Sequence, residues 1–102
     1  MAMNQANDSQ VAVTTVTGAY VVTAADYSIL GDATGGALSV TLPPSASSDR
    51  RVLQVKKIDA SANAVTVDGY ESELVEDAAT QALTLQGENL MLVCDGTQWR
   101  VL

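Results

Sequence analysis

Apolar and polar residues alternate with a period of two along most of this chain. In the run ALSVTL, Leu38, Val40 and Leu42 alternate with alanine, serine and threonine, which is the pattern of a strand with one buried face. Other short β-rich runs lie at 11–17, 19–23, 50–58, 64–69, 81–87 and 89–94, separated by glycine, proline, asparagine and aspartate. The pattern predicts an all-β fold, a small sandwich or barrel-like domain of short antiparallel strands.

Two of these runs carry apolar residues on both faces. Residues 90–94 are apolar at five consecutive positions, so both faces of that strand are expected to be buried. One face can pack in the chain's own core, and the other packs either on a second subunit or beneath a second sheet of the same chain. In 50–58, Val52 and Ile58 share a face with polar residues, as at a partly hydrated interface. The residues predicted to form a subunit interface are Leu90, Met91, Leu92, Val93, Val52 and Ile58.

The last strands are predicted to form a β-hairpin. In LMLVCDGTQWRVL, two apolar runs flank Asp95-Gly96, a dipeptide typical of hairpin turns. Trp99 and Val101 then share one face, and Arg100 lies on the other. Helical spacing also occurs in 71–83, so a short helix around 73–79 is an alternative to a strand at 82–85.

The N-terminal residues differ from the rest of the chain. Residues 1–10 are polar and lack periodicity, and we expect a flexible arm there, followed by a single β domain at 11–102. The 102 residues suffice for one core. The arm has neither the basic region nor the apolar stretch of a secretory signal. No apolar run approaches the roughly 18 residues of a membrane-spanning helix, so no membrane partner is expected.

Charge excludes some partners and leaves one question open. Five basic and 12 acidic residues give a formal net charge of −7, which argues against nucleic acid and anionic membranes as partners. Four of the basic residues lie in 50–57, whereas 58–99 contains eight carboxylates and no basic residue. This segregation produces either complementary patches across a subunit contact or solvated edges of one monomer.

The chain lacks the residues of several kinds of catalytic site. There is no histidine and only one cysteine, which excludes Ser-His-Asp triads, histidine-ligated zinc and an internal disulfide. The glycine-rich run 31–36 lacks the Lys-Ser/Thr of a P-loop. We therefore expect no enzyme, no metal and no cofactor.

Carboxylates and aromatic residues offer two further candidate sites. The carboxylates of 68–77 lack EF-hand spacing, and we interpret them as a solvated acidic loop rather than the paired acids of a glycosidase. They are Asp68, Glu71, Glu73, Glu76 and Asp77. Trp99, Tyr20, Tyr27 and Tyr70 are candidates for a carbohydrate-stacking surface, although a lone tryptophan in a terminal strand is more typical of a core.

Five motifs in order carry a resemblance to a known family. They are YSILGDATGG (27–36), SVTLPP (39–44), VLQVKKID (52–59), AVTVDG (64–69) and VCDGTQWRVL (93–102). Together they resemble a β-rich module of tailed-bacteriophage virion proteins that occurs in head fibres, capsid decoration proteins and tail-fibre segments. The resemblance covers about residues 20–102 and implies a homotrimer without catalytic residues. Such modules usually carry a glycine where this chain has Ser48-Asp49.

The resemblance gives an expected function. It implies a non-enzymatic homotrimeric capsid decoration protein, made in the host cytoplasm, which binds and stabilises the head shell at the virion surface. The partners are then other copies of the chain and the major capsid protein or another virion protein. The alternatives are a head-fibre or tail-fibre module that contacts host surface glycans, and a polysaccharide-degrading tailspike fragment. Residues predicted to attach the arm to the capsid are Asn4, Gln5, Asn7 and Gln10.

Overall fold

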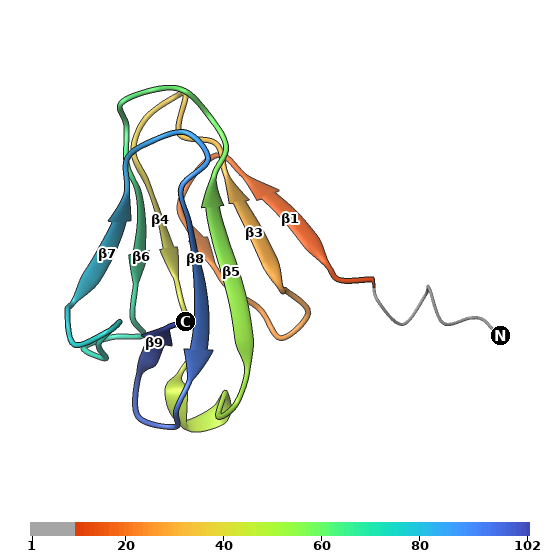
Figure 1. The fold of residues 1–102 in the computed structure, drawn as a ribbon, viewed down its shortest axis with the longest axis vertical. Helices are drawn as coiled ribbons and strands as arrows, with labels where there is room; N and C mark the ends of the chain where they lie inside the picture. The colour runs from red at the N-terminus through yellow and green to blue at the C-terminus, as the bar shows by residue number, and fades with distance from the viewer. Residues whose placement is uncertain (1–9) are drawn as a thin grey trace, which may run out of the picture.

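The computed structural model describes residues 10–102 as two β-sheets packed face to face (Figure 1). The five-stranded sheet has the order β1-β3-β5-β8-β9, and the four-stranded sheet has the order β2-β4-β6-β7. The strands are β1 (Val13–Val16), β2 (Tyr20–Val21), β3 (Ser28–Gly31), β4 (Leu38–Thr41), β5 (Val52–Lys57), β6 (Val65–Asp68), β7 (Thr80–Leu83), β8 (Asn89–Cys94) and β9 (Trp99–Val101). Within the described residues the single 3₁₀ turn η1 (Ser45–Ser47) is the one helical element. The predicted all-β fold is confirmed.

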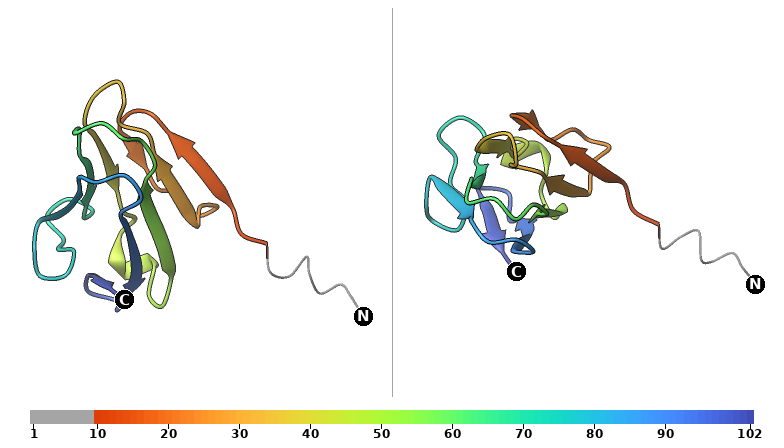
Figure 2. Two further views of the ribbon diagram at one scale, coloured as in Figure 1. Left: turned by 45° about the horizontal axis from the view of Figure 1, so that its top comes forward. Right: turned by 90° about the horizontal axis from the view of Figure 1, so that it is seen from above.

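The chain winds between the two sheets from β1 to β6. Odd-numbered strands enter the five-stranded sheet and even-numbered strands enter the four-stranded sheet, so each turn adds one strand to each layer (Figure 2). Strands added in this way run parallel to their predecessors. After β6 the chain reverses, and β7, β8 and β9 join by antiparallel pairing.

The prediction of antiparallel strands is wrong for the first two thirds of the fold. Four of the seven strand pairings are parallel, and only the last three are antiparallel. Period-two alternation reports that one face is buried but not which way the neighbouring strand runs. Parallel strands usually read as continuous apolar runs because helices cover both faces. Here no described helix covers either sheet, so the parallel strands alternate as antiparallel ones do.

The core lies between the inner faces of the sheets. Strand β5 shows the pattern clearly, because its residues alternate between half-buried and buried along its whole length. Each fully buried leucine or valine contributes about 1.5–3 kcal/mol to folding. The buried apolar side chains are Val16, Val22, Ile29, Ala33, Leu38, Val40, Leu42, Leu53, Val55, Val65, Val67, Val75, Leu83, Leu92, Cys94 and Trp99.

Strand β3 is not among the runs that alternation predicts. It lies between β1 and β5 and pairs in parallel with both. Its inner face presents Ile29, which is fully buried, and Gly31. A Cβ at Gly31 would lie 2.9 Å from a methyl carbon of Val65. Glycine therefore allows the two sheets to approach closely at this point.

The C-terminal hairpin is confirmed. Strands β8 and β9 are antiparallel, with Cys94 opposite Trp99, and the Asp95 N–H donates to the Gln98 carbonyl at 3.1 Å. The Asp95 carboxylate accepts from the N–H groups of Thr97 and Gln98, both at 2.9 Å. Gly96 has φ 94°, a conformation that favours glycine.

The alternative helix around 73–79 is wrong. Val75 and Ala78 form an isolated bridge instead, and Glu76 and Asp77 have φ values of 49° and 65°. The strand that follows, β7, begins two residues earlier than the predicted 82–85. A helix this short is not stable by itself in water. The extended segment instead places Val75 in the core, where it is fully buried. No helix in residues 10–102 has the length and apolar character needed to cross a bilayer.

Candidate interaction surfaces

The outer face of the five-stranded sheet is rich in apolar side chains. Strands β5 and β8 alternate, so Val52 lies beside Val93, and Gln54 lies beside Met91. All four are half-buried although no described segment forms a third layer above them. Leu102, directly after β9, is 70% exposed. We call this surface the outer apolar face and define it by Leu30, Val52, Met91, Val93 and Leu102.

The structure separates the six residues of the predicted interface into two groups. Val52, Met91 and Val93 lie on the outer apolar face, and Ile58 is half-buried just after β5. Leu92 is fully buried, and Leu90 packs against the same core. The alternative in which a second sheet of this chain covers β8 on its other face is wrong, because residues 10–102 contain two layers only. The interface itself stays a prediction, now narrowed to the outward side chains.

The predicted capsid-attachment residues fall mostly outside the described part of the chain. Asn4, Gln5 and Asn7 lie outside it, as does most of the predicted flexible arm. Gln10 is the first described residue and is exposed. It precedes β1, which forms one edge of the five-stranded sheet.

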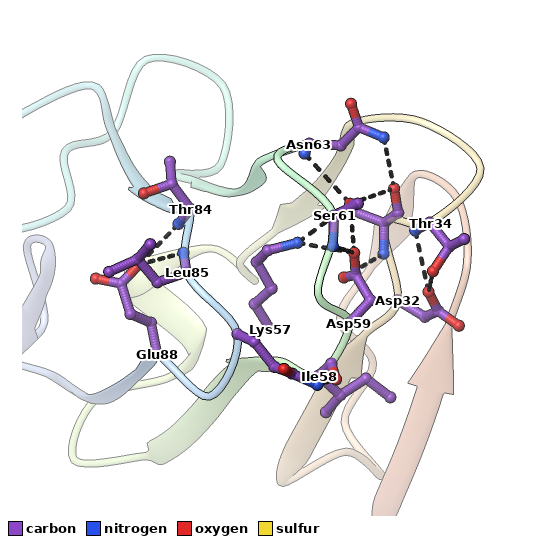
Figure 3. A network of polar contacts seen from close by, with 12 residues as sticks. Asp32, Thr34, Lys57, Ile58, Asp59, Ser61, Asn63, Thr84, Leu85 and Glu88 are labelled. Carbon is purple, nitrogen blue, oxygen red and sulfur yellow. Dashed lines mark hydrogen bonds and ion pairs between the residues drawn. The ribbon is translucent and has the colours of Figure 1, made fainter.

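A lysine lies on the inner face of the sheets, which the sequence analysis does not predict. Lys57 ends β5 and is fully buried, and its Nζ lies 2.8 Å from Asp59 Oδ2 (Figure 3). Asp59 also accepts from the Ala33 N–H at 2.8 Å and from the Ser61 N–H and hydroxyl. The signal is present in the sequence, because Lys57 has the same parity as Leu53 and Val55. We call Lys57, Asp59, Ser61 and their contacts with Ala33 the lysine network.

The lysine network joins two successive crossings between the sheets. Ala33 belongs to the loop from β3 to β4, and Asp59 belongs to the loop from β5 to β6. Asn63 extends the contact by donating to the Ala33 carbonyl at 2.9 Å. Hydrogen bonds from the Lys57 ammonium and the Ser61 hydroxyl outweigh desolvation and lower the pKa of Asp59. The buried Lys57 ammonium donates to Asp59 and Ser61, so it has acceptors within the chain, and the network ties the two loops together.

Asp26 organises the segment between β2 and β3. Its carboxylate accepts from the Tyr20 hydroxyl at 2.6 Å, the Thr14 hydroxyl at 2.8 Å and the Thr23 N–H at 2.8 Å. Burial raises the pKa of Asp26, but the hydrogen bonds, led by that of Tyr20, outweigh it and lower the pKa overall. The Arg51 guanidinium donates to the carbonyls of Thr23 and Asp26, both at 2.7 Å. These contacts hold the first two strands against the rest of the fold.

Three of the five carboxylates of 68–77 have polar partners, which lie on two other elements. Glu73 accepts from the N–H and hydroxyl of Ser45 at 3.0 and 3.1 Å. Glu76 and Asp77 pair with Arg100 at 3.2 and 3.0 Å. Hydrogen bonds from Gln98 and then Arg100 lower the pKa of Asp77. Glu73 therefore anchors η1, whereas the other two acids fix the end of β9.

Neither a pocket nor a metal-binding group occurs within residues 10–102. The four aromatic residues do not form one exposed surface. Trp99 is fully buried, and its Nε1 donates to the Pro43 carbonyl at 3.1 Å. The Tyr20 hydroxyl contacts Asp26, Tyr27 is half-buried, and Tyr70 is 37% exposed.

No known protein-family model matches this chain, and no curated protein or solved structure is significantly similar to it. The resemblance to phage virion modules therefore stays a prediction. On the outer apolar face, Leu102 is exposed and the other four side chains are half-buried on a sheet surface that no layer of residues 10–102 covers.

Proposed function

We propose that this chain is a non-enzymatic structural protein of a tailed-bacteriophage virion, a homotrimer that decorates and stabilises the head shell. The observation that carries the proposal is the outer apolar face. Val52, Met91 and Val93 form neighbouring positions on a sheet surface without a covering layer in residues 10–102. Contiguous apolar surface of this kind marks contacts with other proteins.

One cation at the rim of this face is left without a partner. Lys56 lies on the outer side of β5 and forms no ion pair with any described residue. A carboxylate of a neighbouring copy would satisfy this ammonium locally, whereas the net charge of −7 on every copy opposes association, so the apolar side chains must supply the attraction. An apolar centre with a charged residue at its rim is the usual anatomy of a protein interface.

The place on the head shell follows from the motif resemblance together with trivalency. A trimer presents three identical attachment sites to a shell, and simultaneous engagement raises avidity well above the affinity of one site. Gln10 and the predicted attachment residues before it supply those sites in this proposal. The module then strengthens the shell by bridging neighbouring capsid subunits.

Native mass spectrometry and co-sedimentation with expanded phage head shells test the proposal. We expect chain numbers that are multiples of three, and sedimentation of the protein with the shells. Met91→Asp buries a carboxylate without a cation in the contact, which costs about 3–5 kcal/mol, so trimers are lost. The matched control is Thr66→Asp, on the outer side of β6 in the other sheet, which leaves the mass unchanged. A monomeric wild-type protein that does not bind shells would refute the proposal.

A further inference from the structure

The free edge of β1 has an unusual set of unpaired backbone groups. The Ser28 N–H donates to the Ala12 carbonyl at 3.0 Å, and the Asp32 N–H donates to the Val16 carbonyl at 2.9 Å. In a parallel pair, alternate residues bond to a given neighbour. The N–H and C=O groups of Val13 and Thr15 therefore point away from β3, and no described strand pairs with them.

This edge lacks the devices that usually protect a sheet edge. Residues 10–25 contain no charged residue and no proline. Val11 and Val13 are 53% and 60% exposed. Natural proteins protect edges with charged residues, proline, bulges or very short strands. A regular, uncharged and β-branched edge is suited to accept another strand.

The opposite edge of the same sheet is covered. The Trp99 N–H donates to the Leu74 carbonyl at 3.3 Å, and the Glu76 N–H donates to the Trp99 carbonyl at 2.8 Å. The Glu76 carboxylate also accepts from the Val101 N–H at 2.9 Å. Three of the four outward backbone groups of β9, those of Trp99 and the N–H of Val101, thus have partners within the chain.

The edges of the four-stranded sheet are protected in other ways. Strand β2 has only two residues. Strand β7 lies between acidic residues, since Asp77 precedes it and the Glu88 carboxylate accepts from the Thr84 and Leu85 N–H groups at 2.8 Å. Two chains that paired there would bring like charges together, which is unfavourable.

We propose that β1 pairs with β1 of a second copy, antiparallel and about a twofold axis near Thr14. Val13 then lies opposite Thr15 of the second copy, and both residues exchange the N–H···O=C bonds that are unused within the chain. A twofold axis makes the same edge serve both partners. Segment 10–25 adds no charge to the contact, and Asp26, which lies against Thr14, is buried with its carboxylate hydrogen-bonded within the chain.

This pairing is compatible with the trimer of the proposed function. The twofold axis of two strands paired within one sheet is perpendicular to that sheet, so both outer apolar faces point to the same side. Three such pairs can surround a threefold axis with those faces inward, which gives six chains with D3 symmetry. The number six rests on the proposed function, whereas the pairing of β1 edges does not.

The test is native mass spectrometry of the whole chain with two substitutions on the edge. Thr15→Pro removes an N–H that β3 does not use, so it is tolerated on a free edge and blocks pairing. Thr15→Lys does the same by charge. Thr80→Lys, exposed at the start of edge strand β7, is the matched control. We expect six chains for the wild type and for Thr80→Lys. Each Thr15 variant loses the edge contact and should contain three chains, whereas Met91→Asp loses the face contact and should contain two. The combination of Thr15→Pro with Met91→Asp should be a monomer.

The outcomes separate the two proposals. A wild-type dimer that only the Thr15 variants dissociate supports the edge and refutes the trimer. A wild-type trimer that is insensitive to Thr15→Pro refutes pairing between copies and leaves the edge free for a strand of another protein. Hydrogen exchange gives an independent readout, because pairing protects the Val13 amide in the wild type, whereas that amide exchanges rapidly in Thr15→Lys. Rapid exchange in both proteins would overturn the edge proposal.

Discussion

The central strand pairs of the two sheets obey different rules. In the four-stranded sheet, β4 and β6 bury only leucine and valine and expose only hydroxyl and carboxylate side chains. In the five-stranded sheet, β5 buries a lysine, and β5 and β8 place valine and methionine outward. The outward residues of β4 and β6 are Ser39, Thr41, Thr66 and Asp68. The outward residues of β5 and β8 are Val52, Gln54, Lys56, Asn89, Met91 and Val93.

The difference shows which positions are not explained by packing of the core alone. A sheet with apolar residues inside and polar residues outside is fully explained by folding in water. The five-stranded sheet departs from that arrangement on both of its faces. Inside, Lys57 joins two loops through Asp59. Outside, the outer apolar face is the surface that we propose to be covered by other copies.

The largest expected effect is on the free energy of unfolding when the buried Lys57 is replaced. Lys57→Met keeps the length of the side chain but leaves the buried Asp59 carboxylate without its cation. Loss of one partner of a buried pair lowers the free energy of unfolding by about 3–5 kcal/mol, which urea denaturation followed by Trp99 fluorescence would measure. Arg50→Met, at an exposed position outside both sheets, changes it by less than about 0.5 kcal/mol. Equal losses for the two variants would contradict the assigned role of the lysine network.

A smaller effect, on assembly, is expected when an outward valine of the five-stranded sheet is replaced by the threonine typical of the four-stranded sheet. Val93→Thr gives the five-stranded sheet the hydroxyl character of the four-stranded one with little change in volume. Burying the added hydroxyl in a contact without a partner costs about 1–3 kcal/mol, so the assembly dissociates at a higher protein concentration, measured by sedimentation equilibrium. The reciprocal Thr66→Val has no effect on that concentration. If Thr66→Val strengthens assembly as much as Val93→Thr weakens it, the two faces are equivalent and the proposed interface is wrong.

The smallest expected effect is on the number of protons that the chain takes up when it unfolds in acid. The pKa of Asp59 is lowered in the folded state by Lys57 and Ser61, so its contribution to stability is present above the unfolded pKa of about 3.9. That contribution is lost as pH falls from about 4 through the lowered folded pKa. The Asp59→Asn chain should take up about one proton less on unfolding, so its free energy of unfolding depends less steeply on pH in acid. Acid unfolding followed by circular dichroism measures that dependence. Asp49→Asn, at an exposed position, serves as the control; the same reduction there would argue against a specific role of Asp59.

Several features of the fold could be predicted from local sequence. The period-two runs gave the strands around 38–42, 52–57 and 89–94, and Asp95-Gly96 gave the hairpin, because side-chain parity and turn chemistry are local properties. Strand β3 was missed because Gly31 supplies no apolar signal on its inner face. Strand direction was wrong from β1 to β6, since alternation is the same for parallel and antiparallel neighbours.

The candidate surfaces were predicted less completely than the strands. Consecutive apolar residues in 90–94 indicated a contact, and strand parity alone places Leu92 and Met91 on opposite faces. Which of the two faces the core was decided only by the position of the second sheet. The contact of Asp59 with Ala33 joins residues 26 positions apart, which no local pattern reports. The free edge of β1 likewise depends on which strands are neighbours.

The sequence by itself determined that this protein is built of short strands, that one face of each is buried, and that it carries a net charge of −7. These follow from residue type and spacing alone. Only the tertiary structure decided that successive strands cross between two sheets, that Lys57 is enclosed while Lys56 is not, and that one sheet also places valine and methionine on its outer face. The physical reason is that burial is a property of what lies opposite a side chain, and residues distant in the sequence supply it.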